Sequence, residues 1–533
     1  MSKNKLRFTV PSLIVTAVAV LALSACGGSS SDDATSALAK YMPADALIYV
    51  EGSVRPEQEL SDNVDALATK LTGKSLSDTL DEALAQKEDG VSYTDDVEPW
   101  LGENAAMYVA GDFATDAADS VSSGDLPDAA MAPSGDEDVG IVAESTDVDA
   151  SQAFIDKAAE KDGATDGEYQ GFSYKVSNDD DSVLGIVDDQ VVFATTEDVF
   201  KAMVDASEGE NLEGTAAFSD LSGKAADGSL LNIFVANEPI LESTKSSGFD
   251  LTALYSSLGM DISDTGNLIS LVPTDSEISL VGVTNLDSTI ASGDPSALVE
   301  TFPANSLFAV GSGDVGANIT KVIDAVDKEG LEGVLQPGEL NKEIDKISSQ
   351  GINVRSIVES IETVGLFVSG DSVDTLGGAL VITSADPGPL KSTLGTFQSL
   401  IGLAGDTKVK PLRGRLTGFS VQTPELPGRP VILALKGNKL VLAIGMPAAQ
   451  QVLNGGGASL GDSPAYKAAS QSLSGENVDM FGNPAAIGKL ISGATGGDPE
   501  TRQFTDVLEK FEYMVSGSGS EDKTFEFNLG LKD

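Results

Sequence analysis

The chain has 533 residues, of which 83 are acidic, 33 are basic and none is histidine, so its formal net charge is −50. A chain this acidic repels phosphate backbones, which excludes nucleic acid as a partner. With no histidine and one cysteine, the chain lacks the commonest general base, intrachain disulfides and the usual ligands for zinc, copper or iron. Because 41% of its residues are hydrophobic, the composition still predicts packed cores.

The N-terminal segment has the pattern of a secretory leader with a lipid attachment site. Three basic residues precede an apolar run, residues 8–23, that is too short for a lasting membrane span. Leu23-Ser24-Ala25-Cys26 then places the only cysteine where a lipoprotein signal peptidase would cut. We predict a signal peptide at 1–25, lipidation of Cys26, a flexible tether at 26–41 and a location on the outer face of the bacterial cytoplasmic membrane. Loss of the leader's three basic residues would change the net charge from −50 to −53.

The rest of the chain contains an internal sequence duplication. Met42–Val50 returns as Phe302–Val310 at an offset of 260, and Ala106–Asp112 returns as Gly365–Asp371. Later pairs keep the same order, and both halves end on similar apolar segments, Val281–Val283 and Leu529–Leu531. The pattern predicts two copies of one fold, at residues 42–290 and 302–533.

The first copy carries an insertion near residues 113–138, because the offset between matching segments falls by about 20 residues beyond it. The insertion is rich in Asp, Ala, Ser, Gly and Pro, so it has little apolar surface to bury and much self-repulsion. We interpret it as a mobile acidic loop. Its carboxylates would suit calcium, but no Asp-x-Asp-x-Asp-Gly spacing organises them, so whether it binds calcium stays open.

Within each copy, short strands alternate with helices. Residues 183–187 and 191–195, joined by Asp188-Asp189, predict a hairpin, and residues 431–435 and 440–444 repeat it. Amphipathic helices are expected from Asp149 to Ala159, at 199–206 and at 319–326. Because strands arrive in hairpins, the predicted class is α+β: two tandem copies of a largely antiparallel sheet with helices packed on one face.

Several motifs resemble catalytic or binding signatures but fit local structure better. Gly311, Gly313 and Gly316 form G-x-G-x-x-G, which we interpret as a flexible strand-to-helix turn, since the first copy retains only Gly52 there. Ser459 lies in a G-x-S-x-G sequence, yet a triad built on it needs a histidine. Asp264-Thr265-Gly266 has no partner in the second copy, so a turn is favoured over an aspartic protease half-site.

Two further features, the aspartate clusters and the single tryptophan, also have a local structural explanation. Asp179–Asp181 and Asp188-Asp189 could hold a cation or act as paired carboxylates, although hairpin tips are commonly rich in aspartate. Trp100 is expected in a local packing turn with Pro99, Leu101 and Gly102 rather than in a sugar-binding cleft.

Charge is unevenly divided between the two copies. Residues 26–290 hold 11 basic and 54 acidic residues, whereas residues 291–533 hold 19 and 29. The second copy also concentrates four basic residues in one short stretch, namely Lys408, Lys410, Arg413 and Arg415. A solvated strand edge guarded by basic side chains is the simplest interpretation. The alternative is a candidate anion-binding site that docks onto the acidic copy or onto an anionic envelope polymer.

The lipobox, the Pro-Ala-Asp-Ala sequence at Pro43, the Val97–Gly102 segment and the duplication together resemble an uncharacterised family of bacterial envelope lipoproteins. That family is described only as a domain of unknown function and is common in high-GC Gram-positive lineages. The resemblance covers nearly all of the mature chain. It implies an envelope location but no activity and no site residues that can be carried over.

The sequence therefore predicts a lipid-anchored extracytoplasmic protein with a non-enzymatic binding or scaffolding role in the cell envelope, without a cofactor or a metal. An envelope polymer, a protein or a lipid remain open as partners. One alternative is a carrier of a lipid or other apolar ligand, since curved sheets covered by helices can enclose an apolar cavity. A second alternative is a carboxylate-based hydrolase, which needs two acids facing each other across a cleft.

Overall fold

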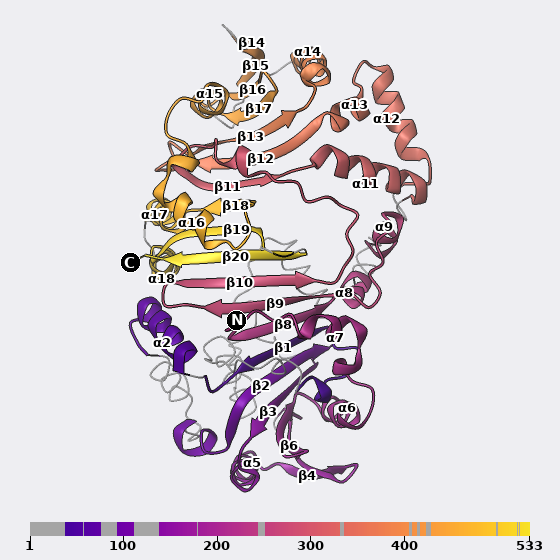
Figure 1. Cartoon of the computed structure of the whole chain (residues 1–533), viewed down its shortest axis with the longest axis vertical. Helices are drawn as coiled ribbons and strands as arrows, with labels where there is room; N and C mark the ends of the chain where they lie inside the picture. Colours follow the sequence, from indigo (N-terminus) through magenta and orange to yellow (C-terminus); the bar gives the residue numbers. More distant parts are fainter. Residues whose placement is uncertain are drawn as a thin grey trace, which may run out of the picture. The chain divides into compact units, whose positions relative to one another are not determined.

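The structure is a computed structural model of the chain, and it describes residues 38–56, 58–75, 93–110, 138–178, 180–243, 251–330, 335–403, 408–412, 416–422, 428–496, 499–519, 521 and 523–532. The chain divides into two compact units (Figure 1). The first unit is Met1–Thr252 with Ile262–Leu286, and the second is Ala253–Asp261 with Asp287–Asp533. Cys26, the predicted tether before Leu38 and nearly all of the predicted acidic loop lie outside the described residues.

The first unit is built on an antiparallel sheet of ten strands in the order β4-β5-β6-β7-β3-β2-β1-β8-β9-β10. Its strands are β1 (Ile48–Ser53), β2 (Leu101–Ala110), β3 (Asp138–Ser145), β4 (Thr165–Tyr169), β5 (Phe172–Val176), β6 (Val183–Val187), β7 (Gln190–Ala194), β8 (Leu231–Ala236), β9 (Gly266–Pro273) and β10 (Glu277–Thr284). Its helical segments are η1 (Ala39–Tyr41), α2 (Gln58–Thr72), η2 (Tyr93–Val97), α5 (Val148–Asp162), α6 (Glu197–Glu208), η3 (Leu212–Gly214), α7 (Ala216–Ser222) and α8 (Asn237–Ser243). Helix α9 (Leu251–Ser257) contains the point where the chain passes to the second unit.

The second unit repeats this order with its own ten antiparallel strands, β14-β15-β16-β17-β13-β12-β11-β18-β19-β20. Its strands are β11 (Ser306–Ser312), β12 (Ile361–Ser369), β13 (Gly377–Ser384), β14 (Lys408–Pro411), β15 (Thr417–Gln422), β16 (Val431–Lys436), β17 (Lys439–Ile444), β18 (Met480–Gly482), β19 (Phe511–Ser518) and β20 (Thr524–Leu531). Its helical segments are α10 (Ser296–Val299), α11 (Val315–Glu329), α12 (Glu339–Ser349), α13 (Val354–Glu359), α14 (Pro387–Leu403), α15 (Met446–Asn454), η5 (Leu460–Asp462), α16 (Pro464–Ser472), α17 (Pro484–Thr495) and α18 (Pro499–Leu508).

The expected hairpins and helices form close to the predicted positions. The first hairpin is β6–β7, and its turn residues Asp188 and Asp189 both have positive φ, as tight hairpin turns require. The second is β16–β17. The expected helix cap at Asp149 is wrong by two residues, because the side chain of Asp147 accepts the hydrogen bond from the Ala150 amide that begins α5.

Helices pack on both faces of each sheet, so the prediction of one covered face is wrong. Neighbouring residues of a strand point to opposite faces. In β16, Ala434 belongs to the main core with residues of α15 and α16, whereas its neighbour Leu435 packs with Leu390 and Leu394 of α14. We call the main-core side of each sheet its inner face and the other side its outer face. The α+β class and the antiparallel strand pairing are confirmed.

The inner face of each unit holds its largest core. In the first unit Tyr49, Phe218 and Phe234 pack edge to face at centroid distances of 5.4 and 5.3 Å. In the second unit Phe302 and Phe367 lie 5.1 Å apart and are fully buried. Within the described ranges, no helix is both long enough and apolar enough to cross a membrane.

Candidate functional site

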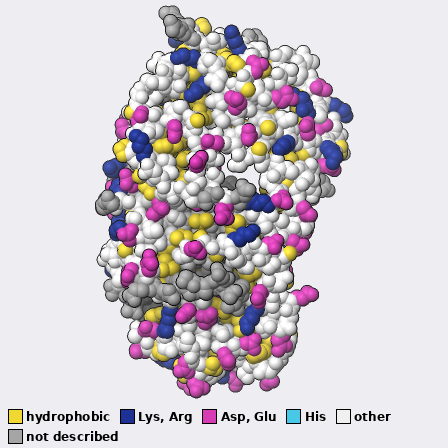
Figure 2. All heavy atoms as spheres, viewed as in Figure 1, with side chains coloured by type: hydrophobic (Ala, Val, Ile, Leu, Met, Phe, Trp, Pro, Cys, Tyr) yellow, Lys and Arg dark blue, Asp and Glu magenta, His cyan; other side chains and the backbone are white. Residues whose placement is uncertain are grey.

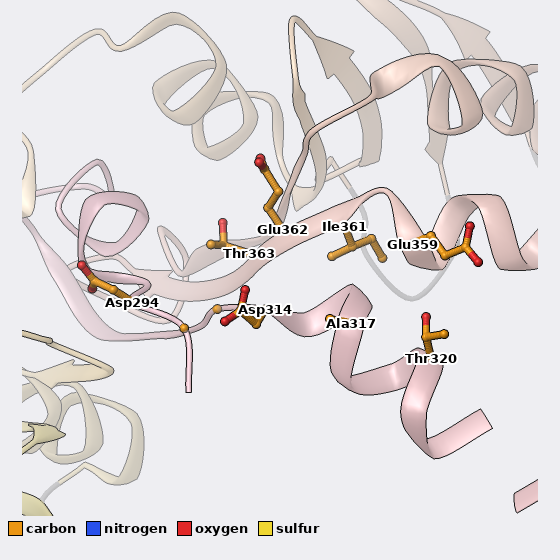
Figure 3. Close-up of a pocket in the computed structure, with 10 residues that line it drawn as sticks. Asp294, Asp314, Ala317, Thr320, Glu359, Ile361, Glu362 and Thr363 are labelled. Atoms are coloured by element: carbon orange, nitrogen blue, oxygen red, sulfur yellow. The ribbon is translucent and has the colours of Figure 1, made fainter. Parts of the chain in front are cut away.

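A pocket of about 550 Å³ opens in the second unit where β11 gives way to α11 (Figure 3). The chain forms it from the loop before α10, the β11–α11 turn, one side of α11, the end of α13 and the start of β12. Its lining residues are Gly293, Asp294, Gly313, Asp314, Ala317, Thr320, Glu359, Ile361, Glu362 and Thr363. Four of these ten are carboxylates, and none is lysine or arginine.

Glycines bring the walls of the pocket close together. A Cβ atom on Gly313 would lie 2.3 Å from the carbonyl carbon of Gly293, so a side chain at this position would force the two backbones apart. A Cβ atom on Gly316 would lie 2.2 Å from the Val358 carbonyl oxygen, which explains why the first turn of α11 can pack against the end of α13. The G-x-G-x-x-G sequence therefore serves as a strand-to-helix turn, as the sequence predicted, with backbone packing as its reason.

The carboxylates lie at both ends of the pocket. In Figure 3, Asp294 and Asp314 stand at one end and Glu359 at the other, with Ala317 and Ile361 between them. Asp294 is held by the Ser296 amide, which donates to its Oδ1 atom at 2.8 Å. The lining has no basic side chain, and among the described residues only Glu359 interacts with a nearby one, Arg355, so the excess of carboxylates favours cations in the pocket. Among the described residues no three acidic side chains are grouped closely enough to hold one metal ion.

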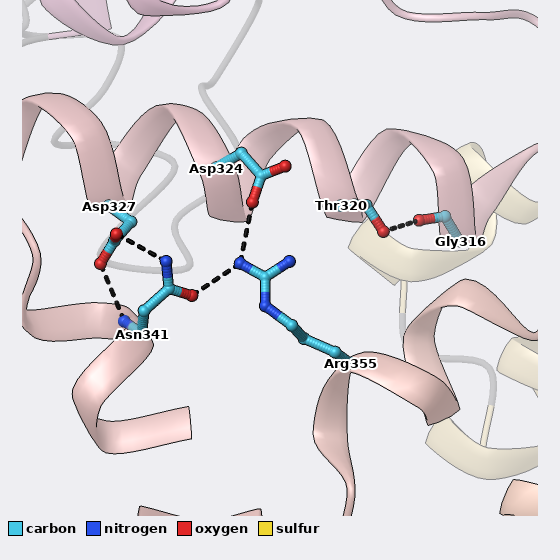
Figure 4. Close-up of polar contacts among 6 residues, drawn as sticks. All are labelled: Gly316, Thr320, Asp324, Asp327, Asn341 and Arg355. Carbon is cyan, nitrogen blue, oxygen red and sulfur yellow. Dashed lines mark hydrogen bonds and ion pairs between the residues drawn. The ribbon is translucent and has the colours of Figure 1, made fainter. Parts of the chain in front are cut away.

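Helix α11 is joined to α12 and α13 by a polar network (Figure 4). The Arg355 guanidinium of α13 donates to Asp324 of α11 at 2.8 Å and to Asn341 of α12 at 2.6 Å. Asn341 in turn donates through its side chain and its backbone amide to Asp327 of α11, at 2.6 and 2.8 Å. The hydrogen bond to Asp324 raises the pKa of Arg355. Because α11 also carries Thr320, the network fixes the helices that form one wall of the pocket.

The first unit has a buried carboxylate on β1, the strand that holds the place of β11 in its sheet. Glu51 of β1 is 3% exposed and lies on the inner face beside Asn232 of β8. Tyr49 donates a hydrogen bond of 2.8 Å to one carboxylate oxygen, and the other has no hydrogen-bond partner within the described structure. Burial raises the pKa of Glu51 to about 8, against the lowering effect of the Tyr49 hydrogen bond. Glu51 is therefore largely protonated at neutral pH, and solvent does not reach it.

The predicted anion-binding residues are only partly described. Lys410 is exposed on β14, which pairs with β15 and has no second neighbour among the described strands. Arg413, Arg415 and the side chain of Lys408 lie outside the described residues. An exposed lysine on such a strand agrees with a solvated edge.

The remaining sequence motifs have local structural roles: a helix cap, a turn and a packing contact. The Ser459 backbone amide and hydroxyl donate to Asp462 at 3.1 and 2.9 Å in a capping box at the start of η5, and these hydrogen bonds lower the pKa of Asp462. Asp264 has a positive φ in the turn before β9, as the turn interpretation predicted. Trp100 is buried, donates from Nε1 to the Asp96 carbonyl at 2.8 Å and packs against Phe154.

The pocket has no signature in the sequence, because its carboxylates come from separate segments with no common spacing. Asp314 follows the second glycine of the G-x-G-x-x-G sequence and was the only visible signal. Asp294, Glu359 and Glu362 look like ordinary solvated acids until the fold brings them together.

Comparison with known proteins gives a family but no activity. A family model described as "Protein of unknown function (DUF3352)" matches residues 8–481. No curated protein matches the chain. Two solved structures, crystal forms I and III of TP0453, are similar to it at 9% and 8% identity, with TM-scores of 0.23 and 0.18. The first match covers 48% of this chain and 80% of the other, and the second covers 78% and 96%.

Proposed function

Because the chain belongs to the DUF3352 family of proteins of unknown function, whose description names no activity, we propose a function from its own residues. The protein is a lipid-anchored, extracytoplasmic protein of the bacterial envelope that binds its ligand without turnover. The pocket of the second unit is its ligand site, and the ligand carries positive charge. The observation that carries this proposal is a pocket of about 550 Å³ lined by four carboxylates and no basic side chain.

The arrangement favours an organic cation over a bare metal ion. The carboxylates stand at both ends of the pocket, and Ala317 and Ile361 provide apolar surface between them (Figure 3). An aliphatic diamine matches this pattern, since its two ammonium groups would meet Asp314 and Glu359 while its methylene chain covers the apolar middle. A lysine or arginine side chain of a partner protein would provide one of the two positive charges and an aliphatic segment.

Calorimetric titration of the purified chain with diaminopentane tests the proposal. We expect saturable binding at low salt that weakens as salt screens the charges. The double variant Asp314→Asn, Glu359→Gln should weaken binding by about tenfold or more, which corresponds to the loss of one or two charged contacts. Asp374→Asn, which removes an exposed carboxylate outside the pocket, is the matched control. Equal binding by the pocket variant and the control would refute the pocket as the ligand site.

The lipid anchor needs a separate test. Cys26 is the only cysteine of the chain, so Cys26→Ala removes the only thiol that could accept a diacylglycerol. We expect the variant to be released from the membrane fraction or to remain an unprocessed precursor, and to lose metabolic labelling with a fatty-acid probe. A variant that still incorporates label and fractionates with membranes would show that the anchor assignment is wrong.

The two units are further proposed to be copies of one ancestral fold. The identical order of ten antiparallel strands supports this, as does the agreement between the repeated segments and that order. Val50 and Val310, which the repeat aligns, both lie in the strand that pairs with β2 or β12 on one side and with β8 or β18 on the other.

A further inference from the structure

Helix α15 ends in the only Asn-Gly sequence of the chain. Asn454 is the last residue of the helix, and Gly455 caps it with a φ of 63°. Gly456 and Gly457 follow, and all four residues are exposed. A glycine after asparagine leaves the backbone nitrogen between them without a neighbouring side chain. That nitrogen is therefore less shielded here than after any other asparagine of the chain.

The side chain of Lys436 holds the amide of Asn454. Its Nζ atom donates to the Asn454 Oδ1 atom at 2.9 Å and to the Leu453 carbonyl oxygen at 2.9 Å. Lys436 is the last residue of β16, so the fold brings it to the end of a helix that comes later in the chain. Leu453 is buried in the main core of the second unit. The ammonium group is thus anchored beside Asn454 by a part of α15 that does not move.

The contact of this lysine with an amide is unusual for so acidic a chain. The sequence has 83 acidic and 33 basic residues, and acidic side chains are spread over the face shown in Figure 2. Other lysines form ion pairs with them, such as Lys157 with Asp96 and Lys201 with Glu197. Lys436 contacts no carboxylate among the residues that the structure describes. Its positive charge therefore acts on the Asn454 carbonyl.

The first unit has neither member of this pair. Helix α6 follows the β6–β7 hairpin as α15 follows the β16–β17 hairpin, and it ends at Glu208. Val187, the last residue of β6, takes the place that Lys436 has at the end of β16. The amide and the ammonium group thus occur together only in the second unit, and the first unit shows that a carboxylate fits the end of the matching helix.

We propose that Asn454 is a site of spontaneous deamidation that Lys436 accelerates. The Gly455 backbone nitrogen attacks Asn454 Cγ and closes a succinimide ring, the bond from Cγ to the side-chain nitrogen breaks, and ammonia leaves with the proton that the Gly455 nitrogen loses. Water then opens the ring to aspartate or isoaspartate, so one water is consumed for each ammonia released. Negative charge develops on Oδ1 during the attack, and the Lys436 ammonium group stabilises it.

The attack requires the last peptide of α15 to leave the helix. In the folded chain the Gly455 amide donates to the Gln451 carbonyl oxygen at 3.1 Å, and this hydrogen bond must break first. Helix ends fray, and glycine leaves a positive φ at little cost because it populates both signs of φ. The aspartate product would keep the Lys436 contact as an ion pair, whereas isoaspartate would lengthen the backbone at the helix cap.

Mass spectrometry of the folded chain during incubation at mildly alkaline pH tests the proposal, since a carboxylic acid is heavier than the amide it replaces. We expect Lys436→Gln to slow conversion of Asn454 by about threefold or more, a smaller effect than in a closed site because the charge is partly solvated. Lys436→Arg keeps the charge and should retain most of the rate. Lys439→Gln, on the same hairpin, is the matched control and should react as the wild type does. Circular dichroism of each variant verifies that it is folded.

The same measurement in urea separates the fold from the sequence. Unfolding removes the contact between Lys436 and Asn454, so Lys436→Gln should then react at the wild-type rate. Asn454→Gln, whose longer side chain cannot close the same ring, should show no conversion at this position in either state.

Three results would overturn the proposal. One is an unchanged Asn454 in the folded chain over a period in which the chain in urea is converted. Another is an equal rate for the folded wild type and folded Lys436→Gln, and the third is equal slowing by Lys439→Gln. The proposal does not depend on diamine binding, so the Asp314→Asn, Glu359→Gln variant should deamidate at the wild-type rate.

Discussion

The two units share one strand order but use the centre of their sheets differently. The first unit buries both faces there, with Met107 on the outer face and Glu51 on the inner face almost completely enclosed. The second unit leaves Leu366 exposed at the place of Met107 and has Gly311 at the place of Glu51. Sheet topology therefore does not determine which surfaces are available to a ligand. The side chains at matched positions determine it.

The two units also differ in how they join β2 to β3 and β12 to β13. In the first unit Asn104 donates to Glu144, whose other oxygen accepts from the amides of Glu103 and Asn104. In the second unit the matching pair is Thr363 and Thr383, which share a hydroxyl–hydroxyl hydrogen bond. The first unit thus has a hydrogen-bonded carboxylate at this position, whereas the second unit has two threonine hydroxyls. One of these threonines, Thr363, lines the pocket.

The largest expected effect is a difference in the free energy of unfolding between alanine variants at matching positions of the two outer faces. Met107→Ala should lower the free energy of unfolding of the first unit by about 2–5 kcal/mol, as truncation of a buried side chain does. Leu366→Ala, at the matching position, should cost less than about 1 kcal/mol, since its side chain is already 39% exposed. Urea denaturation measures both, and fluorescence of Trp100, the only tryptophan, reports on the first unit. Similar costs at the two positions would show that the outer faces do not differ.

A second effect, which is comparable only near pH 8 and smaller at lower pH, belongs to the first unit alone. Glu51 has a folded pKa of about 8 and an unfolded pKa near 4.5, so the folded state retains a proton that the unfolded state releases between these values. Stability therefore falls as pH rises through this window, by about 1.4 kcal/mol per pH unit, and is unaffected by Glu51 below pH 4.5. Glu51→Gln should remove this slope, with the largest gain in stability near pH 8.

Denaturation of both proteins between pH 5 and pH 8, followed through Trp100 fluorescence, checks the slope. Glu103→Gln, which changes an exposed acid on the adjacent strand, should retain the pH dependence of the wild type. If Glu51→Gln and the wild type have parallel pH profiles, Glu51 is already ionised in the folded protein.

The smallest effect concerns the network that supports the pocket wall. Arg355→Ala should cost about 1 kcal/mol or less, because the Arg355 side chain is 33% exposed, that of Asp324 is 59% exposed, and their ion pair is screened by solvent. Diamine affinity should fall with it, since α11 and α13 lose the ion pair that joins Asp324 to Arg355. Arg355→Lys keeps the charge but cannot reach Asp324 and Asn341 in the same planar geometry, so it should restore only part of the affinity. Unchanged affinity in both variants would mean that the wall is held without Arg355.

Local pattern was enough to predict the hairpins, because alternating apolar residues and turn residues such as Asp188-Asp189 act over a few positions. It also predicted that Gly311–Gly316 forms a turn and that Trp100 packs locally. It could not predict the second helical layer, because the apolar residues of a strand buried on both faces lose their alternation, as in Val431–Leu435. The pocket was missed for a similar reason, since Asp294 and Glu359 become neighbours of one cavity only through tertiary structure.

Gly293 and Gly313 set the backbone shape at one end of the pocket, whereas the residues that follow them set its charge. The two backbones meet without an intervening side chain, and Asp294 and Asp314 each follow one of these glycines directly. Asp314 has a φ of 50°, in the left-handed region that asparagine, aspartate and glycine tolerate best, and Asp294 accepts the Ser296 amide, so asparagine is the exchange that would remove both charges and keep the backbone in place. We expect related chains that retain both glycines and carry asparagine after each to share this backbone without the negative charge at that end of the pocket.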